Sequence, residues 1–246
     1  MVSEKMRTLG TKKSTIRTIF EYGRKRAAEV GEENVYDFSI GNPNVPAPEA
    51  VKTAIIDILN TVDSCTLHGY TIAPGDPQVR QTIAESINRR FGTNFAGKNL
   101  FMTSGAAAAI TICFKALHED EADDEFLTFA PYFQEYGCFV ESVGSKLKVV
   151  PANTENFQIQ FAKFEEMLSP KTKAVIVNSP NNPSGVVYSE ETIKKLADIL
   201  EAKSQEFGHP IFIISDEPYR ELVYGNLQVP YIPKYYKSTL VCYSWS

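Results

Sequence analysis

The stretch from residue 174 to residue 185 is Ala-Val-Ile-Val-Asn-Ser-Pro-Asn-Asn-Pro-Ser-Gly. Four aliphatic residues run without a break into a turn, in which Asn-Pro and Ser-Gly are turn-forming dipeptides. Similar apolar runs of strand length, most of them flanked by turn residues, occur at 126–130, 147–150, 211–214 and 240–243. Such unbroken apolar runs are typical of strands buried on both faces, as in a parallel sheet.

Helical patterns separate the predicted strands. An apolar stripe at helical spacing covers 49–59, and a second helix is predicted over 77–91 with Gly92 as its C-cap. A further short strand at 100–103 leads into an alanine-rich helix over 106–117. This alternation of strands and helices predicts an α/β fold with a mostly parallel sheet.

The N-terminal part has a different character. Residues 1–35 are predicted to form a helical arm, and 35–40 alternates between apolar and polar residues like a short strand. The proline-rich connection that follows, over 41–48, is incompatible with regular structure. We therefore predict a boundary between an N-terminal segment, 1–47, and a main domain, 48–246.

The composition excludes several classes of protein. The net charge of -5 leaves no basic footprint for nucleic acid. No apolar run is long enough for a membrane helix, and the first residues lack the apolar stretch of a signal peptide, which predicts a cytoplasmic protein. The four cysteines are scattered, and neither they nor the histidines have metal-ligand spacing, so we expect reduced thiols and no metal site.

Polar residues follow the predicted strands at their carboxyl ends. Ser104, the segment 178–185, Asp216 and the segment 244–246 each follow a predicted strand. Ligands of open α/β sheets bind at the carboxyl ends of the strands. The sequence therefore predicts one ligand site at this edge of the sheet.

Two of these segments are expected to bind charged groups, one an anion and the other a cation. Gly105-Ala106-Ala107 opens a helix directly after a strand, and small residues there let backbone N–H groups approach an anion that the helix dipole favours. The alternative is a plain alanine-rich helix start. Asp216 follows four apolar residues, so its carboxylate is expected to be poorly solvated and to need a cationic partner.

Four segments together resemble a known family: Thr-Ser-Gly-Ala-Ala at 103–107, Asn-Asn-Pro-Ser-Gly at 181–185, Ser-Asp-Glu-Pro-Tyr-Arg at 215–220 and Ser-Trp-Ser at 244–246. They are similar to those of the class I/II aminotransferases, which are fold-type-I pyridoxal-phosphate enzymes. The resemblance implies a three-layer α-β-α large domain over 48–246 and pyridoxal 5'-phosphate as the cofactor. It also implies that 1–47 belongs to a smaller domain, whose remaining part would come after residue 246.

The resemblance assigns cofactor-binding roles by position. The lysine that holds the cofactor as a Schiff base would stand immediately after Ser246. Asp216 would keep the ring nitrogen protonated, while Asn182 and Tyr219 would bond the phenolic oxygen. Phe133 would stack on the ring, with Tyr132 as its rival. The implied phosphate ligands are Gly105, Ala106, Ala107 and Ser244.

Two further positions extend the implied site beyond the main domain. Gly41 matches a residue whose backbone meets the substrate carboxylate, and Asn182 is implied in substrate binding as well. Tyr70, followed by Gly75 and Arg80, matches a segment that sends a tyrosine into the phosphate site of the neighbouring subunit. The resemblance therefore implies a homodimer with composite active sites.

The resulting prediction is a transaminase that moves an amino group between an L-amino acid and a 2-oxo acid. The lysine after Ser246, Asp216 and Tyr219 would be its catalytic residues. One alternative is a pyridoxal-phosphate-dependent β-lyase on the same fold, which would release ammonia and pyruvate. Another is a non-enzymatic aminotransferase-like sensor domain, against which the absence of a helix-turn-helix or basic region before residue 40 counts.

Overall fold

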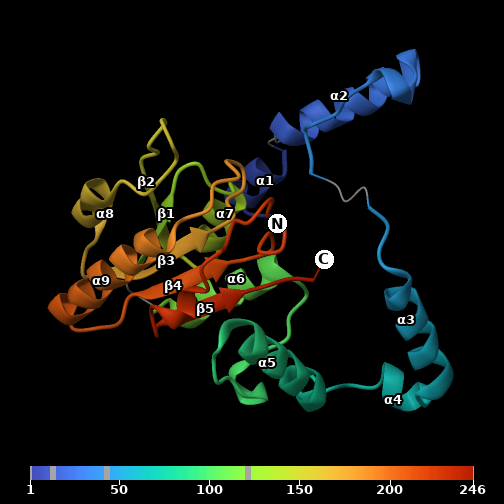
Figure 1. Cartoon of the computed structure of the whole chain (residues 1–246). Coiled ribbons are helices and arrows are strands. Elements are labelled where there is room, and N and C mark those ends of the chain that lie inside the picture. Colours follow the sequence, from blue (N-terminus) through green and yellow to red (C-terminus); the bar gives the residue numbers. More distant parts are fainter. Residues whose placement is uncertain (1, 12–14, 42–44, 120–122, 246) are drawn as a thin grey trace. The chain divides into compact units, whose positions relative to one another are not determined.

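The computed structural model describes residues 2–11, 15–41, 45–119 and 123–245 (Figure 1). The chain forms two compact units, Met1–Tyr70 and Thr71–Ser246. The predicted boundary after residue 47 concerns the domains of a complete family member and stays a prediction.

The first unit is helical, as predicted for the arm. It contains α1 (Glu4–Thr11), α2 (Thr15–Val30), η1 (Glu32–Asn34), α3 (Glu49–Thr61) and α4 (Ser64–His68). The strand predicted at 35–40 is wrong, because this segment is irregular. Its backbone makes a local bond instead, in which the Ser39 N–H donates to the Asp37 carboxylate over 2.8 Å. Such side-chain bonds compete with a strand ladder.

The second unit is built on five parallel strands in the order β2-β1-β3-β4-β5. They are β1 (Glu125–Phe129), β2 (Lys146–Val150), β3 (Thr172–Asn178), β4 (Phe212–Asp216) and β5 (Thr239–Cys242). The predicted parallel α/β sheet is thus confirmed. The strand expected at 100–103 is wrong: among the described residues its ladder partner is missing, and the Met102 N–H donates to the Pro74 carbonyl over 2.9 Å.

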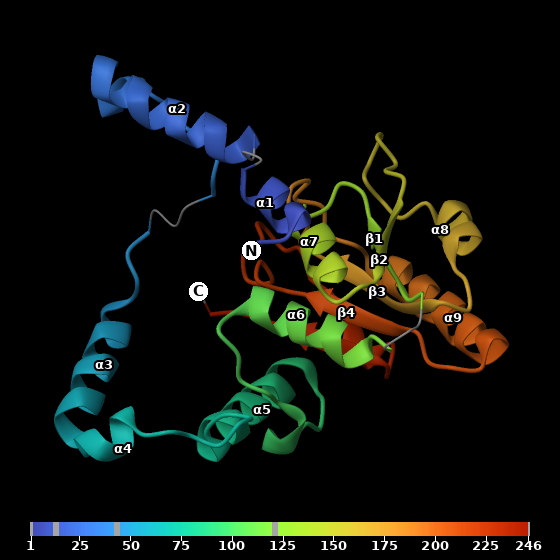
Figure 2. The same cartoon turned by 180° about the vertical axis from the view of Figure 1, so that it is seen from behind.

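Helices cover both faces of this sheet (Figures 1 and 2). One face packs on α6 (Ala106–Leu117) and α7 (Glu135–Ser142), through a buried cluster that includes Phe114, Phe126 and Ile176. The other face packs on α8 (Phe161–Met167) and α9 (Glu190–Phe207), with Val175, Val177 and Leu196 in the buried cluster. Successive strand residues point to opposite faces, so the continuous apolar runs build the expected three layers.

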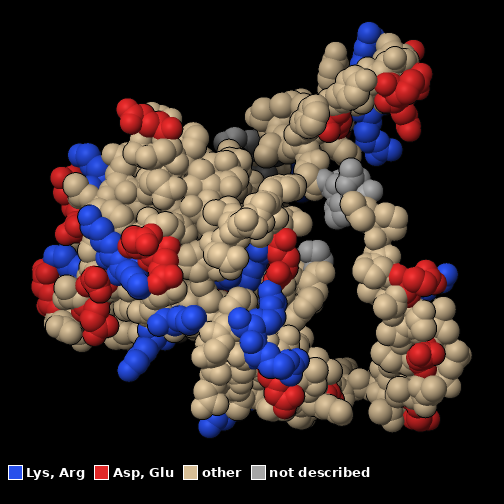
Figure 3. Space-filling model, viewed as in Figure 1, with Lys and Arg blue, Asp and Glu red and all other residues tan. Residues whose placement is uncertain are grey.

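The remaining elements of the second unit are α5 (Pro77–Phe91), η2 (Gly97–Asn99) and η3 (Ile232–Lys234). Gly92 ends α5 in the left-handed conformation, with φ 67° and ψ 38°, and so is the predicted C-cap. Basic and acidic side chains intermingle around α9 in Figure 3. On this helix Lys194 pairs with Glu190 over 2.6 Å. This pattern is that of a solvated helix face.

Candidate active site

The carboxyl ends of β3 and β4 lie side by side, with Asn178 directly opposite Asp216 in the register. The Asn178 amide donates to the Asp216 carbonyl over 2.9 Å, and its oxygen accepts from the Asn182 N–H over 2.7 Å. The turn after β3 is therefore fastened to the end of β4. Two of the predicted segments, 178–185 and the one beginning at Asp216, are brought together at one sheet edge.

Asp216 is a buried carboxylate with one unsatisfied oxygen. The side chain is 5% exposed, and within the described part of the chain its Oδ1 atom has no hydrogen-bond partner. Burial raises the pKa of this carboxyl to about 6, although a hydrogen bond from Tyr136 opposes the rise. A buried acceptor without a donor is costly, so the site fits a cationic N–H group next to Oδ1.

Tyr136 holds the second oxygen of Asp216, a role that the sequence did not reveal. Its hydroxyl donates to Oδ2 from the first turn of α7. Burial and the negative charge of Asp216 raise the pKa of the Tyr136 phenol, so it remains a donor. The available signal was its place three residues after Phe133, but only the tertiary structure shows that the hydroxyl reaches Asp216.

Changing Tyr136 to Phe should raise the pKa of Asp216 above 6 in the cofactor-free protein. Because the folded pKa exceeds the ordinary value of 3.8, Asp216 costs stability as the pH rises from 3.8 to about 6. The full cost is about 3 kcal/mol relative to the protonated carboxyl at low pH, and the Asp216→Asn chain lacks this pH-dependent cost. We expect Tyr136→Phe to move the upper end of this window to higher pH. The measurement is the free energy of unfolding as a function of pH for the parent and Asp216→Asn chains, each with and without Tyr136→Phe. The difference between the parent and Asp216→Asn profiles is then compared with and without the Tyr136 hydroxyl. If the two difference profiles coincide, Tyr136 does not hold the pKa of Asp216 down.

Asn182 and Tyr219 form the second group of polar side chains in the candidate site. The Asn182 amide donates to the Tyr219 hydroxyl over 3.1 Å, which brings together two side chains that lie 37 positions apart. The turn that carries Asn182 is stiffened from within, because the Asn181 oxygen accepts from both the N–H and the hydroxyl of Ser184. These two polar groups are thus available together to bond one ligand oxygen.

The start of α6 is the segment that the sequence predicts to bind an anion. Gly105 is its N-cap at φ 84°, a conformation that L side chains rarely adopt, and the helix has no side-chain cap. The uncapped N–H groups that follow, on Ala106 and Ala107 among others, remain available to an anion. Gly105 and Ser244 both line one cavity of about 480 Å³, whose lining does not include Asp216, Asn182 or Tyr219.

The aromatic candidates pack on Tyr136. The Phe133 ring meets it edge-on at 5.5 Å, and the Tyr132 ring lies nearly parallel to it at 6.4 Å. Both rings are partly buried against the α6–α7 cluster. The geometry leaves Phe133 and Tyr132 both open as the stacking residue.

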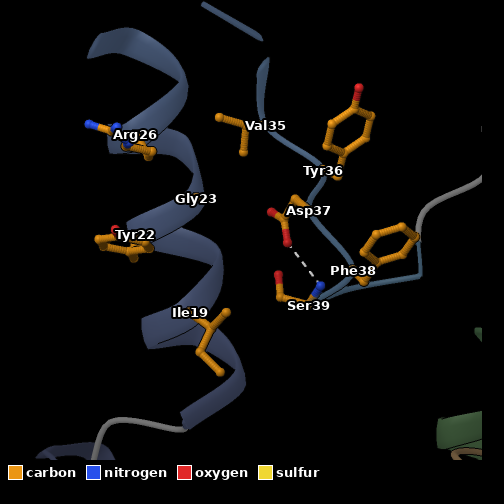
Figure 4. A pocket seen from close by; sticks show the side chains of 9 residues that line it. All are labelled: Ile19, Tyr22, Gly23, Arg26, Val35, Tyr36, Asp37, Phe38 and Ser39. Atoms are coloured by element: carbon orange, nitrogen blue, oxygen red, sulfur yellow. Dashed lines mark hydrogen bonds between the residues drawn. The ribbon is translucent and has the colours of Figure 1, made fainter. Parts of the chain in front are cut away.

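Gly41 and Tyr70 belong to the first unit, where both are exposed. A hollow of about 420 Å³ lies in this unit between α2 and the segment 35–39 that precedes Gly41 (Figure 4). Asp37 approaches Gly23 of α2 so closely that a Cβ there would come within 2.9 Å of the carboxylate.

The position expected for the lysine follows Ser246, which itself lies outside the described residues.

A buried ion pair supports the turn between Asp216 and Tyr219. The Arg220 Nε atom donates to Glu217 over 2.5 Å, and the Ser215 hydroxyl donates to the same carboxylate over 2.7 Å. The other guanidinium nitrogens donate to the carbonyls of Val229 and Pro230 over 2.9 and 3.0 Å. Every charged atom of the pair thus has a partner, although sequence analysis gave neither residue a role.

The described residues contain neither a His/Cys/Asp/Glu group suited to a metal nor a helix long and apolar enough to cross a membrane. The polar groups of the candidate site are the buried Asp216 carboxylate, the pair of Asn182 and Tyr219, and the uncapped N–H groups at the start of α6. Residues 33–246 match the family described as aminotransferase class I and II. The chain therefore belongs to the class I and II aminotransferases.

Particular relatives agree with this membership. The chain is 58% identical to an amino transferase from Eubacterium rectale, with a TM-score of 0.97 over 100% of this chain and 62% of that one. It is 26% identical to the aspartate aminotransferase of Thermus thermophilus in a structure with maleate, with a TM-score of 0.79 over 100% and 61%.

Among curated relatives, the aspartate aminotransferase of Thermotoga maritima is 34% identical over 195 residues, which are 79% of this chain and 48% of that protein. A probable aspartate/prephenate aminotransferase of Aquifex aeolicus is 31% identical over 194 residues, or 78% and 46%. The chain thus spans about half the length of these curated relatives.

Proposed function

We propose that the protein is a pyridoxal-phosphate-dependent aminotransferase that moves an amino group between an L-amino acid and a 2-oxo acid. The observation that carries the proposal is the buried Asp216 carboxylate with its unsatisfied Oδ1, beside the hydrogen-bonded pair of Asn182 and Tyr219. Membership of the family and the names of the relatives support it.

The residues present fit the cofactor. Asp216 would hold the ring nitrogen, Asn182 and Tyr219 the phenolic oxygen, and Phe133 the ring face. The phosphate would take the first turn of α6, from Gly105 through Ala107, together with Ser244. Neither Ala106 nor Ala107 supplies a hydroxyl, so the phosphate would depend on backbone N–H groups and on side chains from elsewhere.

When bound, pyridoxal phosphate supplies an electron sink for the pair left on the amino acid's α-carbon after its proton is removed. The lysine expected after Ser246 would be the base that removes this proton and later returns one. A cation beside Asp216 favours its ionised form and so lowers a pKa that burial and the charge of Glu217 raise. Tyr136 holds Oδ2, which leaves Oδ1 for that cation.

An assay of amino exchange tests the proposal. The holoenzyme is incubated with L-aspartate, which the relatives' names suggest, or with other L-amino acids, and with a 2-oxo acid acceptor. We expect equal amounts of a new amino acid and a new 2-oxo acid, without ammonia. Release of ammonia and pyruvate would show a lyase, and cofactor binding without turnover on any amino acid would point to a sensor domain.

The active unit in this proposal is a cytoplasmic homodimer in which Tyr70 reaches the phosphate of the partner's cofactor. The motive is the spacing of Tyr70, Gly75 and Arg80 together with a phosphate turn that lacks side-chain hydroxyls at Ala106 and Ala107. Tyr70 is fully exposed in the first unit, so its hydroxyl is available to another chain. Substrate carboxylate would be met by the backbone of Gly41 and by Asn182.

Tyr70→Phe should weaken cofactor retention without dissociating the dimer, because a phosphate site short of hydroxyls depends on the borrowed one. Mixing Tyr70→Phe with a variant of the lysine expected after Ser246 should restore activity, since a hybrid dimer contains one site with both wild-type groups. The measurement is activity on mixing two inactive variants, with subunit exchange confirmed. Persistent inactivity would mean that Tyr70 does not act across the interface.

A further inference from the structure

Two cysteines that the proposed reaction does not use lie next to each other in the second unit. Cys113 comes from the middle of α6 and Cys242 ends β5, and their sulfur atoms are 3.8 Å apart. The chain's other cysteines, Cys65 and Cys138, are exposed and free. Nothing in the sequence pattern signals this pair, because 129 positions separate its members.

The pair is reachable from solvent through one member. Cys242 is 1% exposed, whereas Cys113 is only partly buried. Both line the cavity of about 480 Å³ that also touches Gly105 and Ser244. A small neutral oxidant that enters this cavity would therefore meet Cys113 first and find Cys242 behind it.

The two thiols are also chemically different. The hydrogen bond between the two thiols lowers the pKa of Cys113, whereas the same bond and burial raise the pKa of Cys242. The thiolate is the form that reacts with oxidants, so Cys113 has the character of the attacking group and Cys242 that of the resolving one.

We propose that Cys113 and Cys242 form a site of reversible oxidation by hydrogen peroxide, which links α6 to β5 through a disulfide. The Cys113 thiolate attacks one peroxide oxygen, the O–O bond breaks, and hydroxide leaves to be protonated to water. The Cys242 sulfur then attacks the resulting sulfenic acid, the S–O bond breaks, and its oxygen leaves as a second water with the Cys242 proton. Two thiols are oxidised by two electrons while one peroxide is reduced to two waters.

The formation of a disulfide requires the two sulfur atoms to move only a short distance. A disulfide has an S–S distance of about 2.05 Å, so the sulfur atoms must approach by less than the width of one atom. The bond would tie the helix that begins at the Gly105 turn to the residue that lies opposite Asp216 in the sheet register. This inference goes beyond the proposed function and holds whether or not the protein transaminates.

The test uses the purified protein with Cys65→Ser and Cys138→Ser, which removes both exposed thiols. After treatment with hydrogen peroxide, free thiols are alkylated under denaturing conditions, and trypsin peptides are mapped by mass spectrometry. We expect the peptide 99–115 to be joined to the peptide that begins at Ser238, with the loss of two thiols and two hydrogens per chain. Dithiothreitol should restore both thiols.

The matched control is Cys113→Ser in the same background, in which peroxide should leave the Cys242 thiol intact. The same peptide mapping is repeated on the unsubstituted protein, so that the result does not depend on any variant. The same two peptides should be joined there. Intact thiols at both positions, separate oxidation of each to sulfinic acid, or joining only between different molecules would each overturn the proposal.

Discussion

Asp216→Asn should lower turnover by about 10² to 10⁴, while the protein keeps its fold and its sheet. An amide cannot carry the negative charge that keeps a ring nitrogen protonated, and the loss of such a charge interaction costs several kcal/mol in the transition state. The fold should survive because Asn is nearly isosteric and can still accept a hydrogen bond from Tyr136. The measurement is kcat/KM for the amino exchange, alongside the circular dichroism of the variant.

Asp198→Asn is the matched control, because Asp198 lies on the exposed side of α9 and should change turnover little. Turnover of Asp216→Asn close to that of the parent would contradict the role of Asp216. A second readout is independent of activity: the variant should hold the cofactor more weakly than the parent does.

The second large effect is on stability. Arg220→Ala should reduce the free energy of unfolding by about 3–5 kcal/mol, the usual cost of leaving a buried charge without its partner. Glu217 is 2% exposed and Arg220 5%, so water cannot replace the lost guanidinium. The two backbone carbonyls of Val229 and Pro230 would lose their donors as well. Denaturant unfolding of parent and variant measures the difference.

The neighbouring pair of Arg90 and Glu221 provides the control. Its side chains are 41% and 53% exposed, and exposed ion pairs contribute only about 0–1 kcal/mol. Arg90→Ala should therefore cost far less than Arg220→Ala. Equal costs would mean that the buried network does not hold the turn between Asp216 and Tyr219.

The strand-end residues were predictable because their positions follow from local patterns and one rule of topology. Apolar runs mark the buried strands, and parallel strands bring their carboxyl ends to one edge. Asn182, Tyr219 and Asp216 meet there for that reason. The start of α6 followed similarly, since a glycine before an alanine-rich helix leaves N–H groups uncapped.

The wrong and the missing predictions concern residues whose interaction partners are distant in the sequence. The segments 35–40 and 100–103 look like strands, the first because it alternates and the second because it is apolar. A strand also needs a neighbouring strand, and a local pattern cannot show whether one is present. Tyr136 and Arg220 look like ordinary residues until tertiary packing places a hydroxyl on Asp216 and a guanidinium on Glu217. The pairing of Cys113 with Cys242 was hidden in the same way.

The most direct test of the central claim is to trap the cofactor on the protein with borohydride and locate it by mass spectrometry. The segment Ser244-Trp245-Ser246, in combination with Asp216, predicts that the next residue of the polypeptide is a lysine bonded to pyridoxal phosphate. We expect the reduced adduct on that residue and on no other. An unmodified peptide there, or a residue other than lysine, would contradict the account.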